Sequence, residues 1–493
     1  MTMTKQDSHL RDWQERQELA EQMLPIIGRL YRNRGVELRI YGRPLINSST
    51  IELLKAHRYV KHVEGAALSI HDTFTVLKVL DGLNLAPVSL DLGELTTNYL
   101  KGRAGRVTVE DYLKSELAPV LGATPVSDHA PQDVVLYGFG RIGRLLARLL
   151  IERTGPAQKL RLRAIVVRRP REPDLKKRAS LLRRDSIHGP FNGSITVDEE
   201  HNAIIANGNF IQLIYADAPD GIDYTRYGID NALVVDNTGK WKDREGLGLH
   251  LKAKGAAKVL LTAPAKGDIK NIVYGVNHRS LEDGDTIVSA ASCTTNAITP
   301  TLKVINDAFK VEYGHVETVH SYTNDQNLID NYHKAERRGR SAALNMVITS
   351  TGAAKAVAKA LPELEGRLTG NAIRVPTPNV SMAVLNLTLA QEVTRERVNA
   401  VMRDVTHSDL REQLDYSAST ELASSDLIGS RHAGILDSEA TIANGRHCVL
   451  YVWYDNEFGY SCQVLRVIQA MTGLDLPHLP ARQTPTAEAT AIR

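Results

Sequence analysis

A glycine-rich turn between an apolar run and an apolar-periodic run constrains the fold of this chain more than any other feature. The stretch DVVLYGFGRIGRLLARLLIE contains a G-x-G-x-x-G pattern formed by Gly138, Phe139, Gly140, Arg141, Ile142 and Gly143. Glycines at these spacings permit a tight strand-to-helix turn and let backbone N–H groups approach a pyrophosphate. A glycine turn that binds nothing is the alternative. Because LRLRAIVV follows as a second strand, the segment predicts a β-α-β unit.

The rest of the chain beyond residue 130 predicts two successive architectures. Strand-like runs such as FIQLIYA, ALVVDNT and KVLLTAP, with helical segments between some of them, are typical of a mostly parallel sheet. Later runs, including SMAVLNLTLAQ and HCVLYVWYDN, are longer and alternate, which favours a mixed or antiparallel sheet. We therefore expect an α/β chain with a Rossmann-type domain over 131–293 and an α+β domain with a mixed sheet over 294–460.

Residues 1–130 predict a mainly helical domain. Apolar residues recur there mostly at three- and four-residue steps, as in an amphipathic helix: Leu10, Trp13, Leu19, Met23, Ile26, Ile27 and Leu30. Ser48–Thr50 offer caps for a second helix over 51–63, and AALSIHDTFTVLKVLDGLNL is consistent with a third. Thr108 and Asp111 form a weak capping-box pattern before another. The small, polar segment 122–131 predicts a linker, and residues 481–493 predict a flexible tail.

Composition excludes several classes of protein. At roughly 150 residues per domain, 493 residues suggest about three folded units. The 60 basic and 57 acidic residues nearly balance, so we expect no specific nucleic-acid partner and no anionic-membrane partner. No stretch of eighteen consecutive apolar residues occurs, and the N-terminus lacks a leader pattern. Three cysteines are too few for a disulfide framework or a metal knuckle, so we expect a cytoplasmic protein without a bound metal.

Cys293 is the strongest candidate for a nucleophile. It stands between the strand-like TIVSAAS and a predicted helix, and a helix N-terminus favours the thiolate and lowers the thiol pKa. An unperturbed thiol is only slightly ionised at neutral pH, so a neighbouring base is expected. His320, in the strand-like HVETVHSYT, is the candidate base. Without further motifs, a buried cysteine and a core histidine would be the simpler interpretation.

Six motifs in order make the chain resemble the phosphorylating glyceraldehyde-3-phosphate dehydrogenases over about residues 133–476: GFGRIGR, SCTTN, TVHSYTNDQ, STGAAKAV, RVPTPNVS and WYDNEFGYS. The resemblance implies a Rossmann-type cofactor domain, a catalytic domain, and a C-terminal helix near 461–477 that packs back on the cofactor domain. It also implies NAD or NADP as cofactor, a sugar phosphate and inorganic phosphate as small-molecule partners, and a homotetramer.

The resemblance also assigns roles to residues. Cys293 resembles the family nucleophile and His320 its base. The residues matching the substrate-phosphate positions and their neighbours are Arg374, Thr323, Asp325 and Arg337, and those around the attacking phosphate are Ser292, Thr294, Thr351 and Gly352. Besides the glycine turn, the cofactor contacts match Thr238, Gly239, Thr262 and Asn456, of which the last orients the nicotinamide. An ordinary helix cap explains Thr351-Gly352 equally well.

The chain departs from the family pattern at three places. Ala297 replaces a common second cysteine, which removes an oxidation partner without affecting catalysis. The second strand ends in Arg168-Arg169, where NAD-selective sites hold an acid for the ribose 2′-hydroxyl. The segment 330–333 lacks the Leu-Pro pair of strongly NAD-selective relatives. Dual use or a preference for NADP is therefore the expectation, and two solvated arginines are the alternative.

Three functions are consistent with these features. The leading one is reversible phosphorylating oxidation of glyceraldehyde 3-phosphate through a cysteine thioester. An erythrose 4-phosphate dehydrogenase would share the same cysteine, histidine and arginine. A regulatory or binding protein that retains the fold is the third, in which residues 1–130 would contact a partner.

Overall fold

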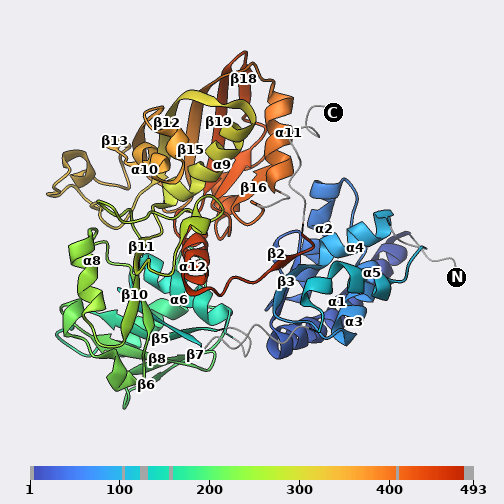
Figure 1. Ribbon diagram of the computed structural model, residues 1–493, viewed down its shortest axis with the longest axis horizontal. Coiled ribbons are helices and arrows are strands. Elements are labelled where there is room, and N and C mark those ends of the chain that lie inside the picture. The colour runs from blue at the N-terminus through green and yellow to red at the C-terminus, as the bar shows by residue number, and fades with distance from the viewer. Residues whose placement is uncertain (1–4, 103–105, 123–130, 155–158, 407–409, 482–493) are drawn as a thin grey trace. The chain divides into compact units, whose positions relative to one another are not determined.

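The computed structural model of the chain describes residues 5–102, 106–122, 131–154, 159–406 and 410–481 (Figure 1). They form two compact units with separate hydrophobic cores. The N-terminal unit comprises the described residues of 1–131, 152–159 and 475–483, and the second unit those of 132–151 and 160–474. The predicted linker over 122–131 and the predicted tail over 481–493 lie outside the described residues, except Gly122, Pro131 and Ala481.

Helices make up most of the N-terminal unit, which confirms the prediction of a mainly helical domain. They are α1 (Lys5–Arg34), α2 (Thr50–Glu64), α3 (Ile70–Gly82), α4 (Leu92–Gly102) and α5 (Val109–Glu116). Ser49 and Glu52 close a capping box at α2, in which the Ser49 hydroxyl accepts the Glu52 N–H and the Glu52 carboxylate accepts the Ser49 N–H. At α5, the Thr108 hydroxyl accepts the N–H of Asp111 at 3.1 Å. Local capping chemistry thus sets where these helices begin.

The N-terminal unit also contains a four-stranded sheet that the sequence analysis did not predict. Its order is β2-β1-β3-β20, with β2 (Arg43–Pro44), β1 (Val36–Ile40), β3 (Val88–Asp91) and β20 (His478–Leu479). Strand β3 pairs in parallel with both β1 and β20. All residues of β1 and β3 are buried, so these short strands show no alternation that a sequence pattern could reveal. The last described strand of the chain therefore belongs to the N-terminal unit.

The first sheet of the second unit has the order β11-β10-β9-β4-β5-β8-β7-β6. Its parallel strands are β4 (Gln132–Tyr137), β5 (Leu160–Val167), β8 (Asn209–Tyr215), β9 (Ala232–Asp236), β10 (Ala256–Leu261) and β11 (Ile287–Ser289). Strands β6 (Ile195–Asp198) and β7 (Ala203–Ala206) extend it in antiparallel pairing. Helices α6 (Arg141–Glu152), α7 (Leu175–Arg183) and α8 (Arg244–Leu251) lie between the strands in sequence. This arrangement confirms the Rossmann-type prediction.

The second sheet of this unit is mixed, as predicted, with the order β13-β14-β12-β15-β19-β17-β16 and β18 beside β19. Its strands are β12 (Val311–Ser321), β13 (Val347–Ser350), β14 (Leu368–Val375), β15 (Ser381–Leu389), β16 (Leu414–Ser417), β17 (Gly434–Asp437), β18 (Ile442–Asn444) and β19 (His447–Tyr454). One face forms a core with helices α9 (Cys293–Phe309), α10 (Ala353–Ala360) and α11 (Arg395–Thr406). Side chains on the opposite face are only half-buried.

Helix α12 (Phe458–Thr472) corresponds to the helix predicted near 461–477. Its residues Val464, Leu465 and Ile468 share a core with Leu146 and Leu150 of α6. The helix ends where Gly473 takes a left-handed φ of 65°. Helix α12 therefore completes the core of the Rossmann-type domain, although it follows the mixed sheet in sequence.

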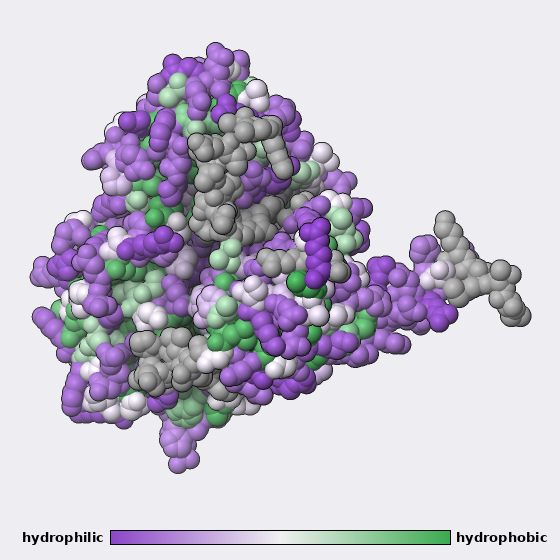
Figure 2. Space-filling model, turned by 45° about the vertical axis from the view of Figure 1, so that its right-hand side comes forward, coloured by the Kyte–Doolittle hydropathy of each residue, from purple (hydrophilic) through white to green (hydrophobic). Residues whose placement is uncertain are grey.

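The surface drawn in Figure 2 is mainly hydrophilic, with hydrophobic residues in small separate groups. Scattered hydrophobic residues of this kind are normal on a water-exposed surface. Within the described ranges, no helix is both long enough and apolar enough to span a bilayer.

Candidate active site

The glycine turn lies at the carboxyl end of β4, where the central strands of the parallel sheet end together. Gly138 has a φ of 98°, a conformation that favours glycine, and its N–H donates to the Val166 carbonyl at 2.9 Å. At Gly143, a Cβ atom would lie 2.3 Å from the Gly138 carbonyl oxygen, so only glycine permits this helix to approach the strand. Helix α6 starts at Arg141 and directs its first N–H groups at the turn. These features fit a dinucleotide pyrophosphate.

The side chains of the glycine turn do not face a ligand. Phe139 is buried in the core, and Ile142 packs against the same core. The Arg141 guanidinium is held by the carboxylates of Asp185 and Glu457. A contact of these three predicted cofactor residues with a dinucleotide would therefore be made by their backbone.

The other predicted cofactor residues lie on the same edge of the sheet. The Asp236 carboxylate at the end of β9 accepts both the N–H and the hydroxyl of Thr238 at 2.7 Å. Gly239 follows with a φ of 60°. After β10, the Thr262 N–H donates to the Asp236 carbonyl at 3.0 Å. The tertiary structure thus brings Thr238, Gly239 and Thr262 beside the glycine turn, whose Tyr137 carbonyl accepts the Asn237 N–H.

Arg168 and Arg169 follow β5 directly, and both are exposed at this edge. Burial raises the pKa of the Tyr137 hydroxyl to about 12, and the Arg168 guanidinium opposes this rise. The Arg168 guanidinium therefore lies near the Tyr137 side chain at the end of β4. The segment 330–333 folds within its own loop, where the Asn331 N–H donates to the Gly339 carbonyl and Tyr332 is 89% exposed.

Cys293 is the first residue of α9, as the sequence predicted. Ser292 caps the helix, because its hydroxyl accepts the Thr295 N–H at 3.0 Å. The half-buried Cys293 Sγ lies 3.5 Å from Nε2 of His320 on β12. The predicted nucleophile and base are thus within contact distance, although 27 residues separate them in sequence.

The orientation of the His320 ring follows from its contacts. Nδ1 lies 2.7 Å from the Ser321 carbonyl oxygen, which can only accept, and 2.9 Å from Arg374 Nη1, which can only donate. Arg374 Nη1 also donates to the same Ser321 carbonyl at 2.9 Å. Because Nδ1 is held on this side, Nε2 is the ring nitrogen that faces the Cys293 thiol. The tautomer that carries its proton on Nδ1 presents the Nε2 lone pair to sulfur and can act as the base.

The electrostatics correct one sequence-based expectation. Burial raises the pKa of the Cys293 thiol, and the Arg374 guanidinium only partly opposes this. Burial, together with Arg374, lowers the pKa of His320 to about 3. The helix N-terminus does not by itself make a thiolate, because desolvation outweighs it here. Both shifts favour the neutral form of the group, and a thiolate forms when the proton moves from sulfur to Nε2.

Two arginines face a common anion position beside this pair. Arg374 on β14 stands opposite His320 in the parallel register with β12. Its Nη1 lies 3.4 Å from the Thr323 hydroxyl, and its Nε is a buried donor with no partner among the described residues. Arg338 Nη2 also lies 3.4 Å from the Thr323 hydroxyl, and Arg338 Nε donates to Asp325 at 2.9 Å. The cluster suits a tetrahedral oxyanion.

The structure brings Arg338, and not the predicted Arg337, to this cluster. Arg337 is exposed and donates to the Ile348 carbonyl at 3.4 Å, whereas Arg338 contacts Thr323 and Asp325. Both arginines lie in the 3₁₀ helix Glu336–Gly339, where successive side chains point about 120° apart. The ERRGR run shows that an arginine is available but not which one turns inward.

The remaining predicted phosphate residues are placed differently from one another. The Thr294 hydroxyl is buried and lies 2.9 Å from the Tyr454 hydroxyl, which also contacts Thr318 at 2.7 Å. Thr351 accepts the Ala353 N–H at 3.2 Å at the start of α10. Gly352 is the N-cap residue of that helix. The Thr351 hydroxyl thus bonds to the first N–H of α10, which is consistent with the helix-cap alternative for Thr351-Gly352.

Asn456 is buried, and its amide orientation is set by one hydroxyl, which is itself held by a backbone N–H. The Ser321 N–H donates to Ser381 Oγ at 3.1 Å, and Ser381 Oγ donates to Asn456 Oδ1 at 2.9 Å. The amide nitrogen of Asn456 is thereby left as the donor. This chain of bonds begins one residue after His320, so Asn456 lies at the reactive end of the site. Among the residues that the structure describes, no cluster of three metal-ligating side chains occurs.

Two family models match the chain: "Glyceraldehyde 3-phosphate dehydrogenase, NAD binding domain" over residues 132–244 and "Glyceraldehyde 3-phosphate dehydrogenase, C-terminal domain" over residues 292–456. A "Glyceraldehyde-3-phosphate dehydrogenase-like protein" of Pseudomonas aeruginosa (strain UCBPP-PA14) is 60% identical over 461 residues, which cover 93% of this chain and 100% of that protein. The "Glyceraldehyde-3-phosphate dehydrogenase 2" of Nostoc sp. (strain PCC 7120) is 42% identical over 335 residues, or 67% of this chain and 96% of that protein. The "Glyceraldehyde-3-phosphate dehydrogenase 1" of Bacillus subtilis (strain 168) is 40% identical over 334 residues, again 67% and 96%. The first relative therefore shares most of the N-terminal unit, whereas the other two matches are long enough for the second unit only.

Proposed function

Because the chain belongs to the glyceraldehyde-3-phosphate dehydrogenase family, we propose that it reversibly oxidises glyceraldehyde 3-phosphate to 1,3-bisphosphoglycerate, with NAD or NADP and inorganic phosphate. The observation that carries the proposal is the 3.5 Å contact between Cys293 Sγ and Nε2 of His320, beside the Arg374 guanidinium. This arrangement places a nucleophile, a base and an anion-binding guanidinium next to one another.

The residues act in a definite order. His320 Nε2 takes the thiol proton, and Cys293 Sγ attacks the aldehyde carbon to form a thiohemiacetal. The His320 imidazolium, held through Nδ1 by the Ser321 carbonyl, gives this proton to the oxygen of the adduct. A nicotinamide, when bound, would supply the acceptor for the hydride that leaves the adduct carbon. His320 Nε2 takes the hydroxyl proton of the adduct as the thioester forms. Inorganic phosphate then attacks the thioester carbon, and Cys293 leaves as the thiolate.

Anion binding supports both the substrate and the base. A phosphate at the cluster of Arg374, Arg338 and Thr323 would satisfy the buried Arg374 Nε. Its negative charge would also offset the guanidinium charge that depresses the pKa of His320. The base is therefore strengthened when the phosphorylated substrate is in place.

Steady-state kinetics with two aldehydes tests this proposal against its nearest rival. We expect turnover of glyceraldehyde 3-phosphate that requires inorganic phosphate and disappears in Cys293→Ser. A higher kcat/KM for erythrose 4-phosphate would instead favour an erythrose 4-phosphate dehydrogenase. Absence of turnover on both aldehydes, in a protein that binds dinucleotide, would favour a binding or regulatory role.

For the cofactor, we propose dual use or a preference for NADP. The exposed arginines at the end of β5 and the lack of an acid there support this choice, because a charge-assisted contact to a 2′-phosphate contributes about 1.5–3 kcal/mol. A kcat/KM ratio favouring NAD by a hundredfold would refute it. If it holds, Arg168→Ala with Arg169→Ala should weaken NADP binding selectively.

We further propose a homotetramer in a reducing, cytoplasmic compartment. The mixed-sheet face opposite α9 leaves Val384 and Trp453 half-buried, and the neighbouring loops expose Leu328, Leu344 and Met346 by more than 70%. These exposed apolar side chains support contact with further copies of the chain. The free state of all three cysteines is consistent with reducing conditions. Mass determination by light scattering would test the tetramer.

A further inference from the structure

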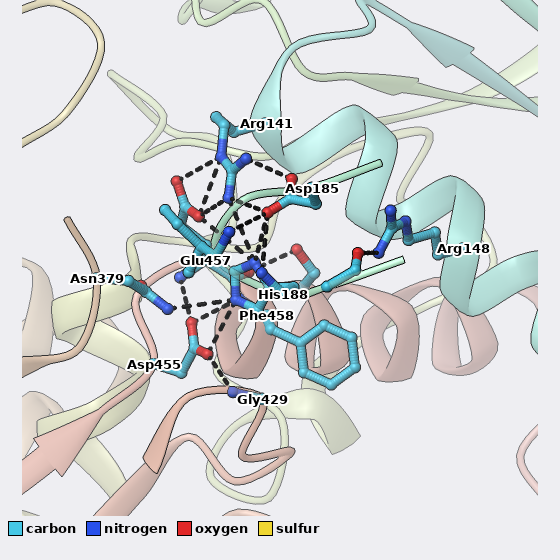
Figure 3. A network of polar contacts seen from close by, with 12 residues as sticks. Arg141, Arg148, Asp185, His188, Asn379, Gly429, Asp455, Glu457 and Phe458 are labelled. Atoms are coloured by element: carbon cyan, nitrogen blue, oxygen red, sulfur yellow. Dashed lines mark hydrogen bonds and ion pairs between the residues drawn. The ribbon is translucent and has the colours of Figure 1, made fainter. Parts of the chain in front are cut away.

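Both acidic neighbours of Asn456 are held by a polar network that the proposed chemistry does not use (Figure 3). Asp455 is buried, and its Oδ1 accepts the N–H groups of Glu457 and Phe458 at 3.0 and 2.8 Å. Its Oδ2 accepts the Gly429 N–H at 2.8 Å and lies 3.1 Å from His188 Nε2. The turn that carries Asn456 is therefore held from the side of Asp455.

Glu457 holds the turn from the other side. Arg141 Nε donates to both Glu457 carboxylate oxygens, at 2.9 and 3.1 Å, and Arg141 Nη2 forms an ion pair with Oε2. The same guanidinium also pairs with Asp185, which in turn accepts the N–H groups of Ile187 and His188 at 2.9 Å. Asp185, Glu457 and His188 have side chains at most 14% exposed, so water screens these contacts weakly.

The network joins two parts of the site that are far apart in sequence. Arg141 is the first residue of α6, immediately after the glycine turn, and 316 residues separate it from Glu457. Asn456 is also bonded through Ser381 to the strand end that carries His320. A displacement of the 455–457 turn would therefore move the Asn456 amide relative to both the glycine turn and the Cys293–His320 pair.

We propose that Arg141 and His188 are positioning residues that hold the Asp455-Asn456-Glu457 turn, so that the Asn456 amide nitrogen orients the nicotinamide over Cys293. This inference rests on the proposed dehydrogenase function. Neither residue is a catalytic residue, because each acts through the turn. Arg141 thereby contributes to the site through its side chain as well as through its backbone in the glycine turn.

Arg141→Gln tests the proposal, and Arg148→Gln is a matched control. Arg148 lies on the same helix and donates to the carbonyls of Leu182 and Gly189, and none of its contacts with described residues involves the 455–457 turn. Both changes remove an arginine that ties α6 to the segment 182–189, so a merely structural role predicts similar thermal midpoints and similar kinetics for the two variants.

We expect Arg141→Gln to lower kcat about 10- to 100-fold, the size of effect that misplacement of a reacting group produces, with KM and the dinucleotide Kd within about threefold of wild type. The second readout needs no aldehyde. At alkaline pH, where the Cys293 thiol ionises, wild-type protein saturated with the oxidised dinucleotide should show charge-transfer absorbance from the Cys293 thiolate beside the nicotinamide, and this absorbance should be lost in Arg141→Gln. Arg148→Gln should retain it.

Conservative changes complete the test. Glu457→Gln keeps an acceptor for Arg141 and should stay within about threefold of wild type, because a neutral acceptor still holds the turn. His188→Asn should lose part of the absorbance without losing dinucleotide affinity. Equal kinetic losses in Arg141→Gln and Arg148→Gln, or an unchanged absorbance in Arg141→Gln, would overturn the proposal. Failure of the proposed function is a separate result, since it appears as wild-type protein that binds dinucleotide but turns over neither aldehyde.

Discussion

Replacing Arg338 with Leu should damage the reaction far more than replacing its neighbour Arg337. Arg338 Nη2 lies 3.4 Å from the Thr323 hydroxyl, and Arg374 Nη1 lies at the same distance from that hydroxyl. A phosphate beside Thr323 is therefore within reach of both guanidinium groups. Arg337 reaches only the carbonyl of Ile348 among the contacts of the described residues, and its side chain is exposed.

The size of the effect follows from these contacts. One hydrogen bond between charged groups contributes about 1.5–3 kcal/mol, which corresponds to about 10- to 150-fold in kcat/KM. The change also leaves the Asp325 carboxylate without the Nε bond of Arg338, and its negative charge then repels phosphate in the same direction. Arg337→Leu removes an exposed contact and should change kcat/KM by less than about twofold.

The assay compares both variants on glyceraldehyde 3-phosphate and on glyceraldehyde, which lacks the phosphate. We expect Arg338→Leu to lose kcat/KM selectively on the phosphorylated substrate. Equal losses on the two aldehydes would show that Arg338 supports the fold of the loop and does not bind phosphate. A larger loss in Arg337→Leu would refute the assignment from the 3₁₀ helix.

Four further results are expected. Burial raises the pKa of the Cys293 thiol, so only a small thiolate fraction reacts with iodoacetamide near neutral pH. In dinucleotide-free protein, the alkylation rate should therefore rise about tenfold per pH unit between pH 7 and pH 8.5. A rate that does not change with pH would instead indicate an ion pair between Cys293 and His320. His320→Asn should lower the rate of aldehyde oxidation by about 10²- to 10⁴-fold, and a loss below tenfold would exclude it as the general base. The pKa of Asp185 is lowered from 3.8 to about 2: burial raises it, but the N–H groups of His188 and Ile187 and the Arg141 guanidinium lower it by more. Ionised Asp185 therefore stabilises the fold above about pH 4, and this stabilisation is lost as the pH falls toward 2. Asp185→Asn should therefore reduce the free energy of unfolding in urea by about 2 kcal/mol at pH 7 and by progressively less at pH 4 and 3, whereas a constant difference would contradict the linkage. A chain of residues 132–474 should retain turnover. It should also be more soluble than a chain of residues 132–493, because the longer chain keeps β20 without its partner strand β3. Complete loss of turnover in a folded 132–474 chain that binds dinucleotide would show that the N-terminal unit completes the site.

Local chemistry was sufficient to predict much of this protein from its sequence. The glycine spacing predicted the strand-to-helix turn, since the left-handed φ of Gly138 and the close approach at Gly143 each require the absence of a Cβ. Ser49 and Thr108 predicted helix starts, because a cap bonds to residues three positions away. The ordered motifs predicted the family and the cysteine–histidine pair. All of these features depend on neighbours within a few residues or on motifs read in order.

Only the tertiary structure decided which side chains meet. β20 lies near the C-terminal end of the sequence, yet it pairs with β3 of the N-terminal unit. The sequence did not predict this pairing, because backbone groups make it and a strand of two residues shows no hydrophobic pattern. The inward arginine is Arg338 because of the rotation per residue in a 3₁₀ helix. The rise in the Cys293 thiol pKa comes from burial by distant segments, which a helix N-terminus in the sequence does not reveal. The contact between Arg141 and Glu457 spans 316 residues, and only the packing of the Rossmann-type sheet against α12 and the end of β19 brings these two charges together.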